Sequence, residues 1–129
     1  MQTILIVEDE EAVRENLVEL LEAEGFATLA AVDGGTGLEL ARRHKPDLIL
    51  CDVVLPELDG FALLAALRED PATAALPLLF LTAHADSAQR QCGLELGASA
   101  YLTKPFTRRE LLAAIRGCLG NTPGAEVIL

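Results

Sequence analysis

Short apolar runs alternate with longer amphipathic stretches along the chain, and this alternation limits the possible folds more than any other feature. The stretches between the runs have apolar residues at helical spacing. Strands that alternate with helices predict parallel βα units with right-handed crossovers. We therefore expect an α/β fold, a doubly wound five-stranded parallel sheet flanked by five helices. The predicted strands are Thr3–Val7, Ala27–Ala31, Leu48–Cys51, Leu78–Leu81 and Ala100–Leu102.

Start and stop signals bound the helical stretches. Thr36 with Glu39, and Thr107 with Glu110, match the capping box that opens many helices. Residues 120–129 (GNTPGAEVIL) are rich in glycine and polar residues, so we expect a flexible tail or the start of a linker. The predicted helices are Glu10–Glu24, Thr36–His44, Gly60–Glu69, Ala85–Leu96 and Thr107–Leu119.

The charge balance narrows the classes of partner. Twenty acidic residues against ten basic ones give a formal net charge of −10, which disfavours direct binding to nucleic acid by this domain. The chain shows neither a signal peptide nor an apolar run long enough to span a membrane, so we expect a cytoplasmic protein that does not bind membranes.

The three cysteines, Cys51, Cys92 and Cys118, lie far apart in the sequence. They suggest neither a disulfide framework nor a zinc site, and we expect single buried thiols.

Candidate functional residues follow the predicted strands, because ligands in such sheets bind at the carboxyl ends of the strands. Glu8 and Asp9 follow the first strand, Asp52 the third, Thr82 the fourth and Lys104 the fifth. Carboxylates that converge at one edge repel one another, and a bound divalent cation relieves that repulsion. Oxygen ligands with room for water suit Mg²⁺. A carboxylate beside Mg²⁺ can attack a phosphoryl group to form an acyl phosphate, aided by a nearby lysine and hydroxyl.

Four motifs carry a resemblance to a known family. They are ILIVEDE, LILCDVVLPELDG, LFLTAHAD and GASAYLTKPF, in this order and each at the end of a predicted strand. Together they resemble the receiver domain of two-component response regulators, the chemotaxis-regulator-like domain. The resemblance covers Gln2–Leu119 and implies the flavodoxin-like strand order 2-1-3-4-5.

The resemblance assigns a role to each matching position. Asp52 is expected to be the phospho-acceptor, with Mg²⁺ bound by Asp9, by Asp52 and by the backbone carbonyl of Val54. Glu8, which stands where many members have aspartate, is expected to act on the metal through water or a hydrogen bond. The apolar side chain of Val54 offers nothing to position a hydrolytic water, so a long-lived phosphoryl group is expected. Lys104 is expected to pair with the phosphoryl oxygens.

The resemblance also predicts how the signal leaves the site. The peptide bond between Lys104 and Pro105 is expected to be cis. Thr82 is expected to move toward the phosphoryl group, and Tyr101 to swing inward into the vacated space. The implied phosphoryl donor is a sensor histidine kinase or a histidine phosphotransfer protein. The output partner or domain is expected to bind through the fourth helix, fifth strand and fifth helix.

Three alternatives stay open. An aspartate-nucleophile phosphatase would need a second acid two residues after Asp52, where this chain has Val54. A pseudo-receiver binds partners without phosphorylation, but it lacks the acceptor or the metal acids that are present here. A signalling switch, whose only chemistry is its own phosphotransfer and autodephosphorylation, is therefore favoured over an enzyme. Within that class, a stand-alone regulator and a receiver attached to an output domain or to a hybrid kinase remain possible.

Overall fold

The computed structural model describes residues 1–83 and 87–120. Residues 121–129 of the expected tail or linker lie outside the described residues. So do Ala85 and Asp86, the first two residues of the fourth predicted helix. Five strands alternate with five helices, as the periodicity predicted. The strands are β1 (Thr3–Val7), β2 (Ala27–Ala31), β3 (Leu48–Asp52), β4 (Leu78–Thr82) and β5 (Ala100–Thr103). The helices are α1 (Glu11–Ala23), α2 (Gly34–His44), α3 (Gly60–Glu69), α4 (Ser87–Glu95) and α5 (Arg108–Leu119).

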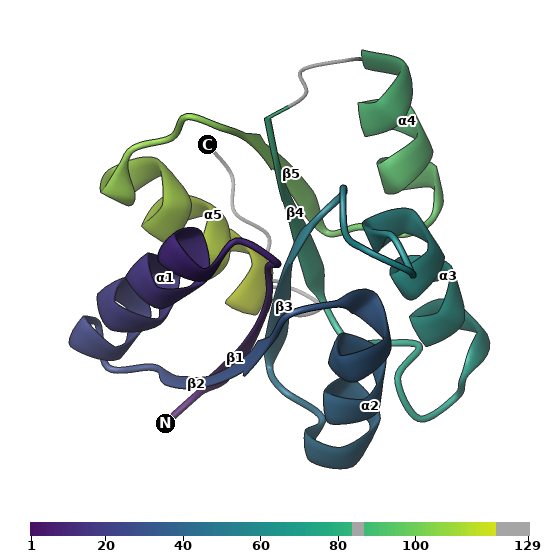
Figure 1. Ribbon diagram of the computed structural model, residues 1–129, viewed down its shortest axis with the longest axis horizontal. Coiled ribbons are helices and arrows are strands. Elements are labelled where there is room, and N and C mark those ends of the chain that lie inside the picture. Colours follow the sequence, from purple (N-terminus) through teal and green to yellow (C-terminus); the bar gives the residue numbers. More distant parts are fainter. Residues whose placement is uncertain (84–86, 121–129) are drawn as a thin grey trace.

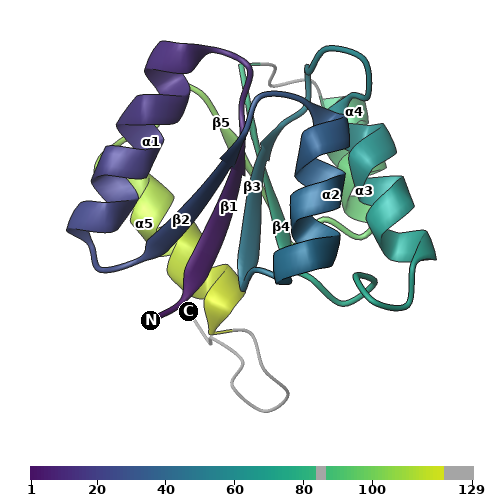
Figure 2. The ribbon, with the colours of Figure 1, turned by 60° about the horizontal axis from the view of Figure 1, so that its bottom comes forward.

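The strands form one parallel sheet in the order β2-β1-β3-β4-β5, which confirms the predicted fold class and strand order. Helices cover both faces of the sheet (Figure 1). Figure 2 shows α1 and α5 on one side of it and α2, α3 and α4 on the other. The fold therefore has three layers, with the central strands β1, β3 and β4 shielded from water on both faces.

Burial on both faces explains why the central strands are apolar throughout. Alternate side chains point to opposite faces of a strand. Ile4 and Ile6 of β1 accordingly pack in the cluster that includes α1 and α5. Leu5 packs on the opposite face, in the cluster that includes α2 and α3. On that second face the ring of Phe80 packs edge-on against Phe61 of α3, with ring centroids 5.3 Å apart.

Helix α2 corrects one prediction. It begins at Gly34 rather than Thr36, and its N-cap is Asp33, whose side chain accepts a hydrogen bond from the Thr36 N–H at 2.7 Å. The capping box predicted for Thr36 and Glu39 is therefore wrong. A Cβ atom at residue 34 would lie 2.1 Å from the carbonyl oxygen of Leu58. Only glycine allows the helix to start so close to another loop, and that contact is invisible in the sequence.

The other predicted capping box is confirmed, because the side chains of Thr107 and Glu110 cap each other's backbone N–H groups at the start of α5. The cysteine prediction holds for Cys51 and Cys118 but is wrong for Cys92, which is exposed. The reason is the rotation of α4, which buries the neighbouring Gly93 against aromatic rings instead.

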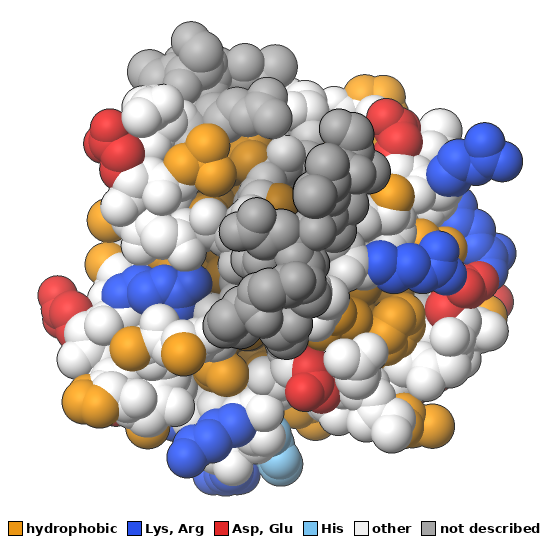
Figure 3. Space-filling view, turned by 180° about the vertical axis from the view of Figure 1, so that it is seen from behind, with side chains coloured by type: hydrophobic (Ala, Val, Ile, Leu, Met, Phe, Trp, Pro, Cys, Tyr) orange, Lys and Arg blue, Asp and Glu red, His pale blue; other side chains and the backbone are white. Residues whose placement is uncertain are grey.

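The surface of the described residues is mixed in character. On the face shown in Figure 3, basic side chains lie in separate groups with acidic and apolar atoms between them. No helix within the described ranges is long and apolar enough to cross a membrane.

Candidate functional site

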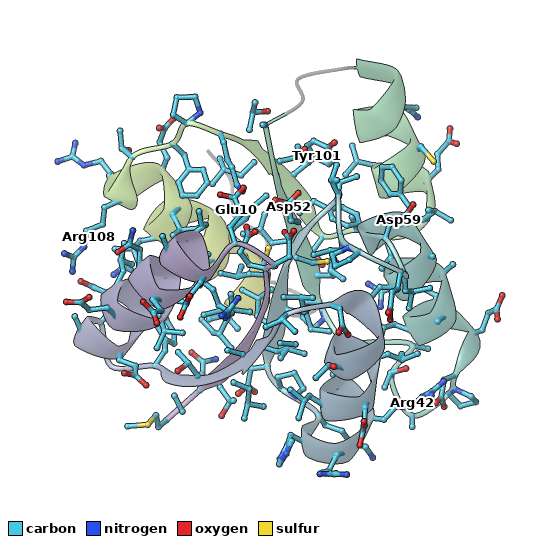
Figure 4. The ribbon with its side chains drawn as sticks, in the orientation of Figure 1. Glu10, Arg42, Asp52, Asp59, Tyr101 and Arg108 are labelled. Atoms are coloured by element: carbon cyan, nitrogen blue, oxygen red, sulfur yellow. The ribbon has the colours of Figure 1, made fainter. Side chains whose placement is uncertain are left out.

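The strand register brings the predicted site residues to one edge of the sheet. Val7 pairs with Cys51, so the loop after β1 lies beside the end of β3. Asp52 in turn pairs with Leu81, one residue before Thr82. Figure 4 shows Asp52 in the middle of this carboxyl edge, with Glu10 next to it.

A cavity of about 320 Å³ opens at this edge. One water occupies roughly 30 Å³ of liquid volume, so several waters or a hydrated ion fit inside. Its walls come from the first turn of α1, from the loops after β1, β3 and β4, and from the residue after β5. The lining residues are Asp9, Glu10, Val13, Asp52, Val54, Ala83 and Lys104.

Lys104 ties two of the acids together. Its Nζ donates to Oδ2 of Asp52 at 2.9 Å and to Oε1 of Glu8 at 3.1 Å. Its backbone N–H donates to the carbonyl oxygen of Thr82 at 2.6 Å, which holds the end of β5 against the end of β4. The peptide bond between Lys104 and Pro105 is cis.

Asp52 is held from its own loop as well. Its Oδ1 accepts from the Val54 N–H at 3.1 Å, and its side chain is 13% exposed. The loop returns tightly at Gly60, whose N–H donates to the Val53 carbonyl oxygen at 2.8 Å. The Asp52 carboxylate is therefore oriented by Lys104 on one oxygen and by Val54 on the other, while it still reaches the cavity.

Glu8 is almost fully buried, at 2% exposure. Its Oε1 accepts from Lys104, and its Oε2 accepts from the Glu10 N–H at 3.1 Å. Burial raises the pKa of Glu8 above its ordinary value, although the Glu10 bond and the Lys104 charge act in the opposite direction. Glu8 is therefore paired with Lys104, and both carboxylate oxygens of Glu8 accept hydrogen bonds.

The pKa of Lys104 reports the same cluster. Burial by itself lowers this pKa, but the hydrogen bond to Asp52 and the negative charges of Asp52 and Glu8 together raise it above its ordinary value. Lys104 is therefore a fully charged ammonium at neutral pH.

The donor set suits Mg²⁺. Among the described residues, no three His, Cys, Asp or Glu side chains converge on one point as a complete metal cage. Mg²⁺ does not require such a cage, because it keeps several waters and is commonly bound through one or two carboxylates. Asp9 and Asp52 provide two carboxylates in one cavity, next to the backbone of Val54.

The two residues expected to act as a switch lie inside the fold. Thr82 is fully buried, and Tyr101 is 8% exposed. The Tyr101 ring packs edge-on against Phe80, with centroids 5.9 Å apart and the ring planes at 60°. In this structure, the Tyr101 ring is therefore already inside the protein.

The sequence patterns did not single out three residues that help to form the site. Glu10 and Val13 line the cavity from the start of α1. Arg14 donates through Nη1 to the carbonyl oxygens of Glu8 and Asp9. Their one signal in the sequence is their position in the first helical turn after the acidic pair, where side chains one turn apart share a face.

The comparisons with known proteins agree with this geometry. The family model of the response regulator receiver domain matches residues 4–116. A transcriptional regulatory protein of Streptomyces coelicolor, CseB, is 44% identical over 126 residues, which cover 95% of this chain and 53% of that protein. RpaA of Synechocystis sp., a DNA-binding dual master transcriptional regulator, is 42% identical over 122 residues, which cover 95% of this chain and 51% of that protein. The chain thus spans about half the length of these curated relatives.

Solved structures show the same fold. A putative response regulator of Chloroflexus aurantiacus has a TM-score of 0.87 and 38% identity, over 92% of this chain and 97% of that one. The receiver domain of a sensor histidine kinase from Pseudomonas aeruginosa, with a magnesium ion coordinated in its active site cleft, has a TM-score of 0.83 and 34% identity, over 93% of this chain and 98% of that one. With its sheet order, its acidic edge and these matches, the chain belongs to the family of response regulator receiver domains of two-component signalling.

Proposed function

We propose that this chain takes a phosphoryl group onto Asp52 and changes conformation to control an output partner or domain. The observation that carries the proposal is the 2.9 Å contact between Lys104 Nζ and Asp52 Oδ2. Both residues line a cavity whose wall also includes Asp9. The donor is a phosphohistidine of a sensor histidine kinase or of a histidine phosphotransfer protein. The reaction is the chain's own modification and its reversal by water, so the protein is a switch rather than a turnover enzyme.

The transfer needs alignment and charge neutralisation more than covalent help. A carboxylate oxygen of Asp52 bonds to phosphorus while the bond from phosphorus to the donor's imidazole nitrogen breaks. The imidazole then takes up a proton from solvent. Lys104 already forms an ion pair with the Asp52 carboxylate. Its ammonium is therefore close to the position that the negative phosphoryl oxygens would occupy during the transfer.

Asp9, Asp52 and the backbone carbonyl of Val54 would hold Mg²⁺, with Glu8 acting on it through water or a hydrogen bond. When bound there, the ion neutralises charge on the phosphoryl oxygens. The magnesium in the receiver domain from Pseudomonas aeruginosa supports this assignment. So does the cavity, which combines two carboxylates with space for water.

The proposed output runs through Thr82 and Tyr101. A phosphoryl group on Asp52 draws the Thr82 hydroxyl toward it, and the position of the Tyr101 ring shifts between two packings. The surface formed by α4, β5 and α5 then binds the output partner or domain. The names of the relatives support a transcriptional output for the whole protein. In this proposal the present domain works in the cytoplasm and binds neither nucleic acid nor membrane itself.

The test is phosphorylation of the purified chain by acetyl phosphate in the presence of Mg²⁺. We expect one phosphate adduct by intact-mass spectrometry, lost on removal of Mg²⁺ and lost in Asp52→Asn. Asp59→Asn is the matched control, because this exposed acid caps α3 a few residues downstream and asparagine caps equally well. A folded wild type that gains no adduct would refute the proposal and favour a pseudo-receiver. An adduct retained in Asp52→Asn would assign the acceptor to another residue.

A further inference from the structure

The loop between β1 and α1 carries two acids of the site, Glu8 and Asp9, but it lacks the side-chain cap that often stabilises the start of a helix. Glu10 is the N-cap residue of α1, and its side chain makes no capping hydrogen bond. Instead the side chain of Arg14 folds back along the first turn of the helix. Its Nη1 donates to the carbonyl oxygen of Glu8 at 3.0 Å and, more weakly, to that of Asp9 at 3.5 Å.

The bonds from Arg14 include one to the backbone of Asp9, which the other hydrogen bonds described for this loop do not contact. The Glu8 N–H donates to the Ala31 carbonyl oxygen at 3.0 Å, and the Glu10 N–H donates to the Glu8 side chain. These two bonds hold the residues on either side of Asp9. Among the hydrogen bonds described for this loop, only the one from Arg14 reaches the backbone of Asp9 itself. Asp9 is also exposed, so burial does not set the direction of its carboxylate.

The position of Arg14 is unexpected on charge alone. A guanidinium next to a cation site repels the cation, so simple electrostatics would favour a neutral residue there. A guanidinium is also planar and presents its donors in a fixed geometry, which suits it to gripping backbone carbonyls. Its charge makes those bonds stronger than bonds between neutral groups.

We propose that Arg14 is a positioning residue that holds the β1–α1 loop so that the Asp9 carboxylate faces the cavity, and that it thereby supports Mg²⁺ binding despite its own positive charge. The inference rests on the proposed receiver function. It concerns orientation alone, because Arg14 contacts backbone oxygens rather than the acceptor carboxylate.

The experiment is a titration of Mg²⁺ into ¹⁵N-labelled protein, followed by NMR at the amides of Asp9 and Val54. Groups that orient metal ligands typically contribute about 10- to 100-fold in metal affinity. We expect Arg14→Met to weaken Mg²⁺ binding by about 10-fold, the low end of that range, because one of the two bonds is long. Arg109→Met is the matched control, since it removes the same charge from an exposed position on α5 and should leave the affinity unchanged.

Orientation of the loop by Arg14 and repulsion of the cation by its charge predict opposite changes in Mg²⁺ affinity when the residue is replaced. If Arg14 acts only through its charge, Arg14→Met binds Mg²⁺ more tightly than wild type. If Arg14 merely stabilises the fold, Arg14→Met melts at a lower temperature but binds Mg²⁺ as tightly as wild type. Either result overturns the inference and leaves the receiver function intact. Should Arg14→Met fail to fold, Arg14→Lys decides, because it keeps the charge but loses the planar fork; an affinity equal to or above that of wild type overturns the inference. A wild type that binds no Mg²⁺ overturns the inference and the metal part of the proposed function together.

Discussion

Substitution of Gly60 by alanine tests whether the backbone beside Asp52 is as tightly packed as the structure indicates. Gly60 is the first residue of α3, directly beside the end of β3. An added Cβ atom would lie 2.5 Å from the carbonyl oxygen of Asp52, 2.9 Å from the Phe80 ring and 2.9 Å from the Cα atom of Val53. Ordinary van der Waals contact begins at 3.4 Å, so the loop and the strand end would have to separate by roughly 0.9 Å.

The energetic cost follows from the kind of atom that must move. Overpacking a well-packed region costs about 1–3 kcal/mol, and two of these three neighbours are backbone atoms, so we take about 3 kcal/mol. Alanine gains about 1 kcal/mol over glycine in a helix interior and no more than that at the first residue of a helix, which leaves a net loss of at least about 2 kcal/mol. For a domain of this size, that loss lowers the melting temperature by about 8 °C.

The assay pairs thermal denaturation, followed by circular dichroism, with the rate of adduct formation from acetyl phosphate. Misplacement of a reacting group by 1 Å can slow a reaction by about 100-fold, and we expect a loss of that order because the Asp52 backbone must shift. Gly117→Ala is the control, since no atom lies within 4 Å of its added Cβ. This control should raise the melting temperature by about 3 °C through helix propensity. A Gly60→Ala protein that melts and reacts like wild type would refute the reasoning.

Substitutions at Lys104, Val54 and Thr107 test three other features of the structure. Although burial lowers it, the pKa of Lys104 is raised above its ordinary value by the hydrogen bond to Asp52 and by the charges of Asp52 and Glu8. Its ion pairs therefore stabilise the fold at neutral pH, where Asp52 and Glu8 are ionised, and are lost as the pH rises through the raised pKa. Urea denaturation across this range should show a steeper alkaline loss of stability in wild type than in Lys104→Met. Val54 is 59% exposed and lines the cavity. Val54→Asn should shorten the lifetime of the phosphoryl group by positioning a water, and an unchanged decay rate of the mass adduct would contradict this account. Thr107→Ala removes a capping box from α5 and should cost about 1 kcal/mol in thermal denaturation, with no change in Mg²⁺ affinity.

Where sequence reasoning failed, the cause was a contact between segments distant along the chain. The capping pattern at Thr36 was a reasonable local signal, but Gly34 let α2 begin earlier against the Leu58 carbonyl. Helical spacing did not reveal which side of α4 is buried. The structure turns Gly93 toward the aromatic rings and leaves Cys92 in water.

The site shows the same division. The sequence located its chemical groups, because in a parallel sheet the residue after each strand is bound to reach the carboxyl edge. It did not show that Glu8 accepts from Lys104, a pair separated by 96 residues. Nor did it reveal Arg14 as a tie on the acidic loop, since nothing local distinguishes it from other arginines on helix surfaces.

The amino-acid sequence by itself determined the order of elements, the parallel sheet and the edge at which the acids, hydroxyl and lysine gather. These follow from local periodicity and from the geometry that every parallel sheet shares. Only the tertiary structure decided which acids pair with Lys104 and which helix face is buried. Those outcomes depend on side-chain packing between segments that meet only after folding, and a single substitution in either segment can change them.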